Sequence, residues 1–266
     1  MALADLVLSG CADPLVLRSA AEAAAADEVD AALAHAGHPD ADVRLALTRT
    51  LADLGEPGPE LLGIVGVLTG DADGRVRDWA CFTLGTLWSE VDTPAVRDLL
   101  AARLDDEVDD VRHEALVGLA VRHDPRALPR VRAALSREDG SLNRMELTAA
   151  GHLADPGLHA LVLRHQEGWD DDGPGGLADA VRRLTDPAGP GDDVLDGMAE
   201  LCRRRGRGQP DGDALGSWRV LLAMLELAPH RAGPVFDAVL ARLDGDDAAV
   251  AALHGSALAQ DAGRLA

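Results

Sequence analysis

One motif returns along this chain at a nearly constant interval. Arginines that follow a valine, or in the last copy an asparagine, lie 33, 35 and 32 residues apart, at Arg44, Arg77, Arg112 and Arg144. Prolines keep almost the same interval, at Pro59, Pro94, Pro125 and Pro156. Two markers with one period indicate two structural elements in each repeat, and such a period is typical of supersecondary units that stack side by side.

Both elements of the repeat have the pattern of helices. Thr93, Asp124 and Asp155 each place a side-chain oxygen before a proline, which predicts a helix start, because that oxygen can accept a bond from a free amide and proline fits the first helical position. In the second element, positions −1, +3 and +7 from the arginine form one apolar face; they hold Val43, Leu47 and Leu51, then Val76, Ala80 and Leu84, then Val111, Ala115 and Leu119. No segment alternates like a strand, so we expect an all-α fold.

The pattern divides the chain into three segments. Residues 1–39 predict N-terminal capping helices, at 13–26 and 28–36, and residues 40–155 hold the regular repeats. Residues 156–266 are less regular, and either degenerate repeats or a helical C-terminal cap would fit them. Helices are expected there at 158–166, 177–184, 194–204, 214–227, 234–243 and 248–258.

Composition limits the environment and the partners of the chain. With 46 acidic and 25 basic residues the net charge is −21, which repels nucleic-acid phosphates and favours a basic partner. The three cysteines are far apart and odd in number, as in a reducing compartment. No stretch is apolar enough to span a membrane. The string Leu8-Ser9-Gly10-Cys11 is like a lipoprotein processing site, but no basic residue precedes it, and we expect a cytoplasmic protein.

Three strings identify a related family. They run from Asp42-Val43-Arg44 to Leu54-Gly55, from Val76-Arg77 to Leu84-Gly85, and from Val111-Arg112 to Leu119-Ala120. Over residues 40–155 they resemble the short bacterial HEAT-like repeats, also called PBS-lyase HEAT-like repeats. The tetratricopeptide repeat needs a tyrosine that this chain lacks, and the ankyrin string is missing. The resemblance implies a right-handed α-solenoid of stacked HEAT-like helical hairpins.

The resemblance also implies a structural role for the repeated arginines. In the family, the arginine of the second helix bonds back to an acid in the preceding turn and forms a ladder between units. The corresponding pairs here are Asp40 with Arg44, Asp73 with Arg77, Asp106 with Arg112, and Glu138 with Arg144.

Enzymes with HEAT-like folds suggest two alternatives. Metal hydroxylases of this kind hold iron with several His-Glu pairs, whereas this chain has only His113-Glu114 at the matching positions. We therefore expect no metal, no cofactor and no catalytic residue, although an enzyme or enzyme subunit like the bilin lyases or the metal hydroxylases stays an alternative. DNA glycosylases of the fold use aromatic residues and a carboxylate in a basic groove. Trp79, Phe82 and Glu114 could supply the first two, but the acids between Asp105 and Asp110 oppose DNA.

The remaining candidate is a protein-binding surface. Second helices usually line the concave side of a solenoid, and the positions there that lie off the apolar face form a candidate partner-binding set: Arg49, Trp79, Phe82, Glu114, Val117 and Glu146. Aromatic residues beside charges are typical of binding hot spots. Alternatively, Trp79 fills a gap between neighbouring helices. The sequence thus predicts a non-catalytic scaffold or regulatory module that holds a protein partner, with a basic partner favoured and nucleic acid as the other alternative.

Overall fold

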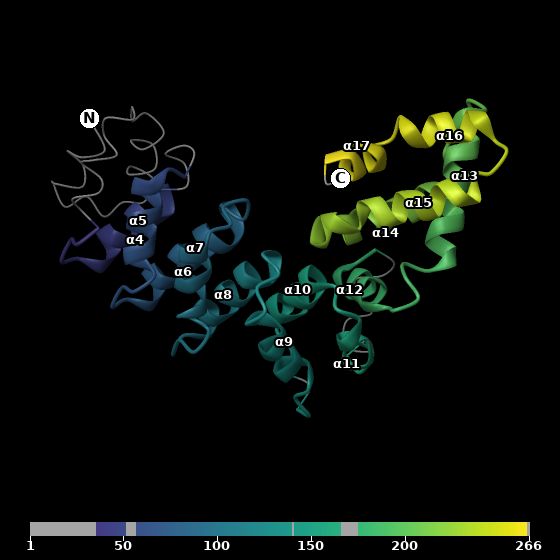
Figure 1. Cartoon of the computed structure of the whole chain (residues 1–266). Helices are drawn as coiled ribbons and strands as arrows, with labels where there is room; N and C mark the ends of the chain where they lie inside the picture. The colour runs from purple at the N-terminus through teal and green to yellow at the C-terminus, as the bar shows by residue number, and fades with distance from the viewer. Residues whose placement is uncertain (1–35, 52–56, 140, 166–174, 265–266) are drawn as a thin grey trace. The chain divides into compact units, whose positions relative to one another are not determined.

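The computed structural model describes residues 36–51, 57–139, 141–165 and 175–264. Within these ranges it contains fourteen α-helices, four short helices of other types and no strand (Figure 1). The predicted all-α class is confirmed, and the hairpins form an α-solenoid. The predicted helices at 13–26 and 28–36 lie outside the described residues, except for Ala36.

The chain divides into two compact units, Met1–Ala127 and Leu128–Ala266, which we term the N-terminal and C-terminal units. This division falls within the segment predicted as regular repeats, at 40–155. The three predicted segments, with limits at residues 39 and 155, stay a prediction. No helix of the described ranges is both long and apolar enough to cross a membrane.

The described part of the N-terminal unit consists of helical hairpins. Its elements are α4 (Ala41–Leu51), α5 (Pro59–Leu68), α6 (Gly74–Phe82), η3 (Thr83–Leu87), α7 (Pro94–Ala101) and α8 (Asp109–Val121), and α9 (Ala127–Leu135) begins at its last residue. Thr93 caps α7 by accepting a hydrogen bond from the amide of Val96, with Pro94 at the first helical position, as predicted. Asp124 does not start a helix directly, because α9 begins at Ala127.

The second helices of successive hairpins pack against one another, α4 on α6 and α6 on α8. The predicted apolar face is the reason: all nine of its residues, from Val43 to Leu119, are at most 1 % exposed. Buried apolar area drives this stacking, because a single hairpin could not cover its own apolar face.

The second helix of the hairpin formed by α5 and α6 ends in a π-helix. The α-helix α6 continues directly into η3, whose five residues form a π-turn. Gly85 of η3 lies against Gly118 of α8, so closely that a Cβ added at Gly118 would come 2.7 Å from the Cα of Gly85. Only two glycines permit this approach, because any side chain at either position would push the helices apart.

The C-terminal unit is also helical. Its elements after α9 are α10 (Arg144–Leu153), η4 (Pro156–Leu158), α11 (His159–Leu163), α12 (Leu177–Thr185), α13 (Asp192–Gly206), η7 (Gly212–Ala214), α14 (Leu215–Leu227), η8 (Pro229–Arg231), α15 (Ala232–Arg242), α16 (Asp247–His254) and α17 (Ala257–Arg264). A continuous apolar core joins α12 to α17. The predicted helices fall on these elements, except that 248–258 divides into α16 and α17 around Gly255.

Candidate functional site

An aromatic pair lies on the second helices of the N-terminal unit. The rings of Trp79 and Phe82 meet edge to face with centroids 5.4 Å apart, and both side chains are half-buried. The guanidinium carbon of Arg49, on α4, lies 4.8 Å from the Trp79 ring centroid, within the range of a cation–π interaction. Residues from two neighbouring repeats are thus in contact here, and Trp79 is neither fully exposed nor part of the fully buried core.

A carboxylate with a raised pKa lies in the same region. The pKa of Glu114 is raised to about 7, mainly by burial and also by the negative charges of Asp78 and Asp110; His113 and a hydrogen bond from Thr86 oppose these effects only in part. The Oε2 atom of Glu114 is buried and has no hydrogen-bond partner among the described residues. Such a group favours either a proton or an incoming cation. We call Arg49, Trp79, Phe82, Glu114 and Asp78 the Trp79 surface.

Asp78 is a member that the sequence analysis missed. Burial raises the pKa of Asp78, and the charge of Asp110 adds to this effect, while Arg49 opposes it. Asp78 directly precedes Trp79 in the chain, so an acidic neighbour was visible in the sequence. Its burial was not, because it depends on how α6 packs against α4 and α8.

Two predicted members of the binding set are less accessible. Val117 is 8 % exposed, so little of its side chain is open to a partner. Glu146, in the C-terminal unit, is 6 % exposed. Its carboxylate accepts hydrogen bonds from Arg137 and, at 2.9 Å, from the amide of Asn143 in a capping box that starts α10. Glu146 is therefore engaged in holding a helix start, and we do not include it in the Trp79 surface.

The arginine ladder exists, with different partners from those predicted. Arg44 donates from Nε and Nη2 to both carboxylate oxygens of Asp71, at 2.6 and 2.7 Å, and Asp71 belongs to the next turn rather than the preceding one. The Nη1 atom of Arg44 donates to the main-chain oxygen of His38, at 2.6 Å. Arg44 thus joins a carboxylate of the following turn to a main-chain carbonyl of the preceding turn.

The next rung repeats this geometry. Arg77 donates to both oxygens of Asp106, at 2.9 and 2.7 Å, and from Nη1 to the carbonyl of Asp71, at 2.8 Å. The Asp106 and Arg77 side chains are only 4 % and 6 % exposed. Burial alone would raise the pKa of Asp106, but hydrogen bonds from Arg77 and the Val108 amide outweigh it and lower the pKa below the ordinary value.

The predicted acids have other roles. Asp40 accepts a hydrogen bond from the amide of Asp42 at the start of α4, and Asp73 caps α6 by accepting from the amide of Arg75. Both therefore hold helix starts, because a residue so near the helix is within reach of its free amides.

The third predicted pair is also arranged differently. Arg112 donates to the main-chain oxygen of Asp106 and to the carboxylate of Asp109, while the Asp106 carboxylate bonds to Arg77. Glu138 and Arg144 are both exposed, and their pairing stays a prediction. The missed partner, Asp71, had a signal: it lies six residues before Arg77, as Asp106 lies six before Arg112.

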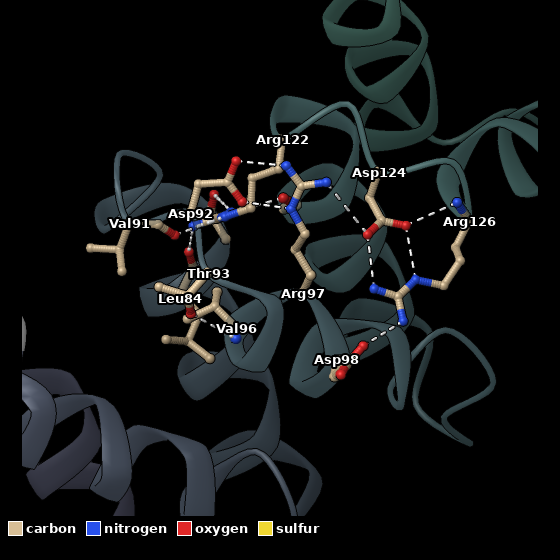
Figure 2. Close-up of polar contacts among 12 residues, drawn as sticks. Leu84, Val91, Asp92, Thr93, Val96, Arg97, Asp98, Arg122, Asp124 and Arg126 are labelled. Carbon is tan, nitrogen blue, oxygen red and sulfur yellow. Dashed lines mark hydrogen bonds and ion pairs between the residues drawn. The ribbon is translucent and has the colours of Figure 1, made fainter.

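A second arginine network lies at the other end of the second helices (Figure 2). Arg122 is 4 % exposed and donates to five main-chain oxygens: Leu84 at 2.7 Å, Gly85 at 3.5 Å, Trp88 at 2.9 Å, Val91 at 3.0 Å and Gly118 at 2.7 Å. Several of these oxygens come from η3 and the turn after it. A buried guanidinium therefore satisfies the carbonyls that the π-turn exposes.

The charged groups around Arg122 neutralise one another, as Figure 2 shows. Arg97 pairs with Asp92, at 2.6 Å, and Arg126 pairs with Asp124, at 2.8 Å, and with Asp98, at 2.7 Å. Arg97 and Arg126 are thus both paired with carboxylates, as suits a structural role.

Other chemistry finds little support in the described ranges. They contain no group of three or more His, Cys, Asp or Glu side chains that could hold a metal ion. Burial raises the pKa of Cys81 to about 12, so its thiol is a poor nucleophile at neutral pH.

Comparisons with known proteins agree with the helical-repeat fold. Residues 61–152 match the family of HEAT repeats. The X-ray structure of YibA from Escherichia coli is similar to the fold, with a TM-score of 0.57 and 22 % sequence identity. The match covers 69 % of this chain and 66 % of YibA, just under two thirds of that protein. No curated protein matches the chain. HEAT repeats in general mediate protein interactions and are in general non-catalytic.

Proposed function

We propose that this chain, whose residues 61–152 are HEAT repeats, is a non-catalytic module that binds a protein partner on the Trp79 surface. The observation that carries the proposal is the half-buried aromatic pair, with Arg49 over the Trp79 ring and the Glu114 carboxylate on the next repeat. Aromatic residues and arginine are the residue types that contribute most to protein interfaces. A surface built from several repeats also suits an extended partner segment.

A basic partner fits this surface best. The charge of Asp110 raises the pKa of Asp78, and both acids raise the pKa of Glu114, so a lysine or arginine of the partner would relieve their repulsion. His113 and Thr86 also face Glu114, and both lower its pKa. Because the cation favours ionised Glu114, affinity increases as pH rises through about 7. The same acids, together with the net charge of −21 on the whole chain, repel the phosphates of a nucleic acid.

Affinity capture from a native lysate, followed by mass spectrometry, tests the proposal. The Trp79→Ala variant should lose the partner, with about 30-fold weaker binding expected for a hot-spot residue. Val67→Ala is the matched control, because Val67 is 68 % exposed on the first helix of the same hairpin. Equal capture by wild type and Trp79→Ala would refute the proposal. So would retention of nucleic acid instead of protein.

Stability measurements distinguish a binding role of Trp79 from a purely structural one. If Trp79 only fills a gap between helices, Trp79→Ala lowers the melting temperature and leaves the affinity of the folded fraction unchanged. If Trp79 binds the partner, the affinity decreases more than the stability. Capture at pH 6 and pH 8 adds an independent comparison, since the basic-partner proposal requires stronger binding at pH 8.

A further inference from the structure

The C-terminal unit contains a small cavity apart from the Trp79 surface. Its volume is about 130 Å³, and α12, the turn after it, α14, η8 and α15 line it. The apolar walls are Leu184, Pro190, Met224, Pro234, Val235 and Ala238. Two arginines, Arg183 and Arg231, and one acid, Asp186, are the charged residues among its lining. A cavity of about 150 Å³ accommodates a benzene ring, so this one has room for about five carbon atoms.

Two of these three residues already have polar partners. Arg183 donates to Asp179 at 3.0 Å, to both oxygens of Asp193 at 2.8 and 2.9 Å, and to the carbonyl of Pro190 at 2.7 Å. Asp186 accepts a hydrogen bond from the amide of Ala188, at 2.8 Å, and lies 3.8 Å from the Nε2 atom of His159. Neither side chain therefore needs a ligand.

Arg231 is different. Its Nη2 atom donates to the carbonyl of Ala154, at 2.9 Å, and among the described residues it has no carboxylate within ion-pair distance. Its Nε atom is buried without an acceptor. Arg103 has the other such Nε atom in the described ranges, but its guanidinium pairs with Asp106, at 3.5 Å. The Nε atom is closed to solvent, but the Arg231 side chain is only partly buried and lines the cavity, so its remaining N–H groups can reach a ligand there.

We infer that this cavity binds a small carboxylate with a branched apolar chain, whose carboxylate pairs with Arg231. A guanidinium and a carboxylate match in geometry through two parallel hydrogen bonds. The apolar chain would fill the space between Met224, Val235 and Ala238, which no polar ligand would do favourably. The site is independent of the Trp79 surface, because all its residues belong to the C-terminal unit.

Titration of the full chain with 3-methylbutanoate, followed by saturation-transfer NMR, tests the inference. The acid should bind at concentrations up to about 10 mM, because a ligand this small makes few contacts and still loses its freedom of motion on binding. Two probes separate the contribution of the charge from that of the apolar chain. The amide 3-methylbutanamide has the same shape without the charge, and acetate has the charge without the branched chain. Both should bind at least ten-fold more weakly.

Variants complete the test. Arg231→Gln should weaken 3-methylbutanoate at least ten-fold, whereas Arg219→Gln, which changes an exposed arginine of α14 outside the cavity, should not. Ala238→Leu fills the cavity and leaves Arg231 in place, so it abolishes binding even if Arg231→Gln does not fold. Absence of binding by wild type, equal binding of the acid and its amide, or normal binding by Ala238→Leu would each overturn the inference.

Discussion

The buried rung between Arg77 and Asp106 allows a quantitative test of the repeat architecture. Asp106→Asn keeps the shape of the side chain and an acceptor for the Val108 amide, but removes the charge opposite Arg77. Breaking a buried pair on one side costs about 3–5 kcal/mol. Arg77 retains two carbonyls and the carboxylate of Glu107, at 3.3 Å, so we expect the lower end, about 3 kcal/mol.

Urea unfolding followed by circular dichroism measures this loss. With a slope of about 2 kcal/mol per molar urea, the midpoint of the affected transition decreases by about 1.5 M. Asp42→Asn is the matched control, because it breaks the ion pair of Asp42 with Arg75, whose side chains are 58 % and 59 % exposed. Its midpoint should not change. An Asp106→Asn shift no larger than that of Asp42→Asn would refute the reasoning.

The same rung predicts a response to acid. The pKa of Asp106 is lowered in the folded chain, so the group binds fewer protons there than in the unfolded chain. Its stabilisation is complete above the unfolded pKa of about 3.9 and is lost as pH falls through the lowered value. Wild type and Asp106→Asn should therefore converge in stability under strong acid, and a constant difference down to pH 2 would contradict this.

Three further outcomes are expected. Gly118→Ala should destabilise the fold by about 1–3 kcal/mol in urea unfolding, because its Cβ would meet the Cα of Gly85 at 2.7 Å; Gly63→Ala, with open space around it, should not. Glu114→Gln should raise the melting temperature at pH 8 and not at pH 4.5, since an acid whose folded pKa is about 7 destabilises the fold as pH rises from its ordinary value towards 7. Arg122→Leu should cost at least about 3 kcal/mol in the same unfolding assay, because five main-chain carbonyls, four of them in buried hydrogen bonds, lose a donor.

Features that depend on neighbouring residues could be predicted from the sequence. The cap at Thr93 and the apolar face from Val43 to Leu119 are confirmed, because side chains within a few residues produce both. The π-turn at η3 had no such signal. It follows the close approach of Gly85 to Gly118, which are 33 residues apart in the chain.

The ladder shows where local reasoning was insufficient. The repeat period identifies Arg44 and Arg77 as equivalent residues, but the carboxylates that pair with them lie 27 and 29 residues further along the chain, where local spacing cannot find them. The structure selects Asp71 and Asp106, in the next turn, because stacking brings those carboxylates beside the guanidinium while Asp40 and Asp73 cap their own helices.

The amino-acid sequence alone determined the helical class, the repeat period and the residues of the apolar faces, because periodic burial requires periodic apolar residues. Tertiary structure decided which charges meet. It placed Arg49 over Trp79, buried Glu114 among other acids, engaged Glu146 in a helix cap and brought Arg231 to the wall of a cavity. These outcomes depend on the distances and solvent exposure that packing creates, and electrostatic energies change steeply with both.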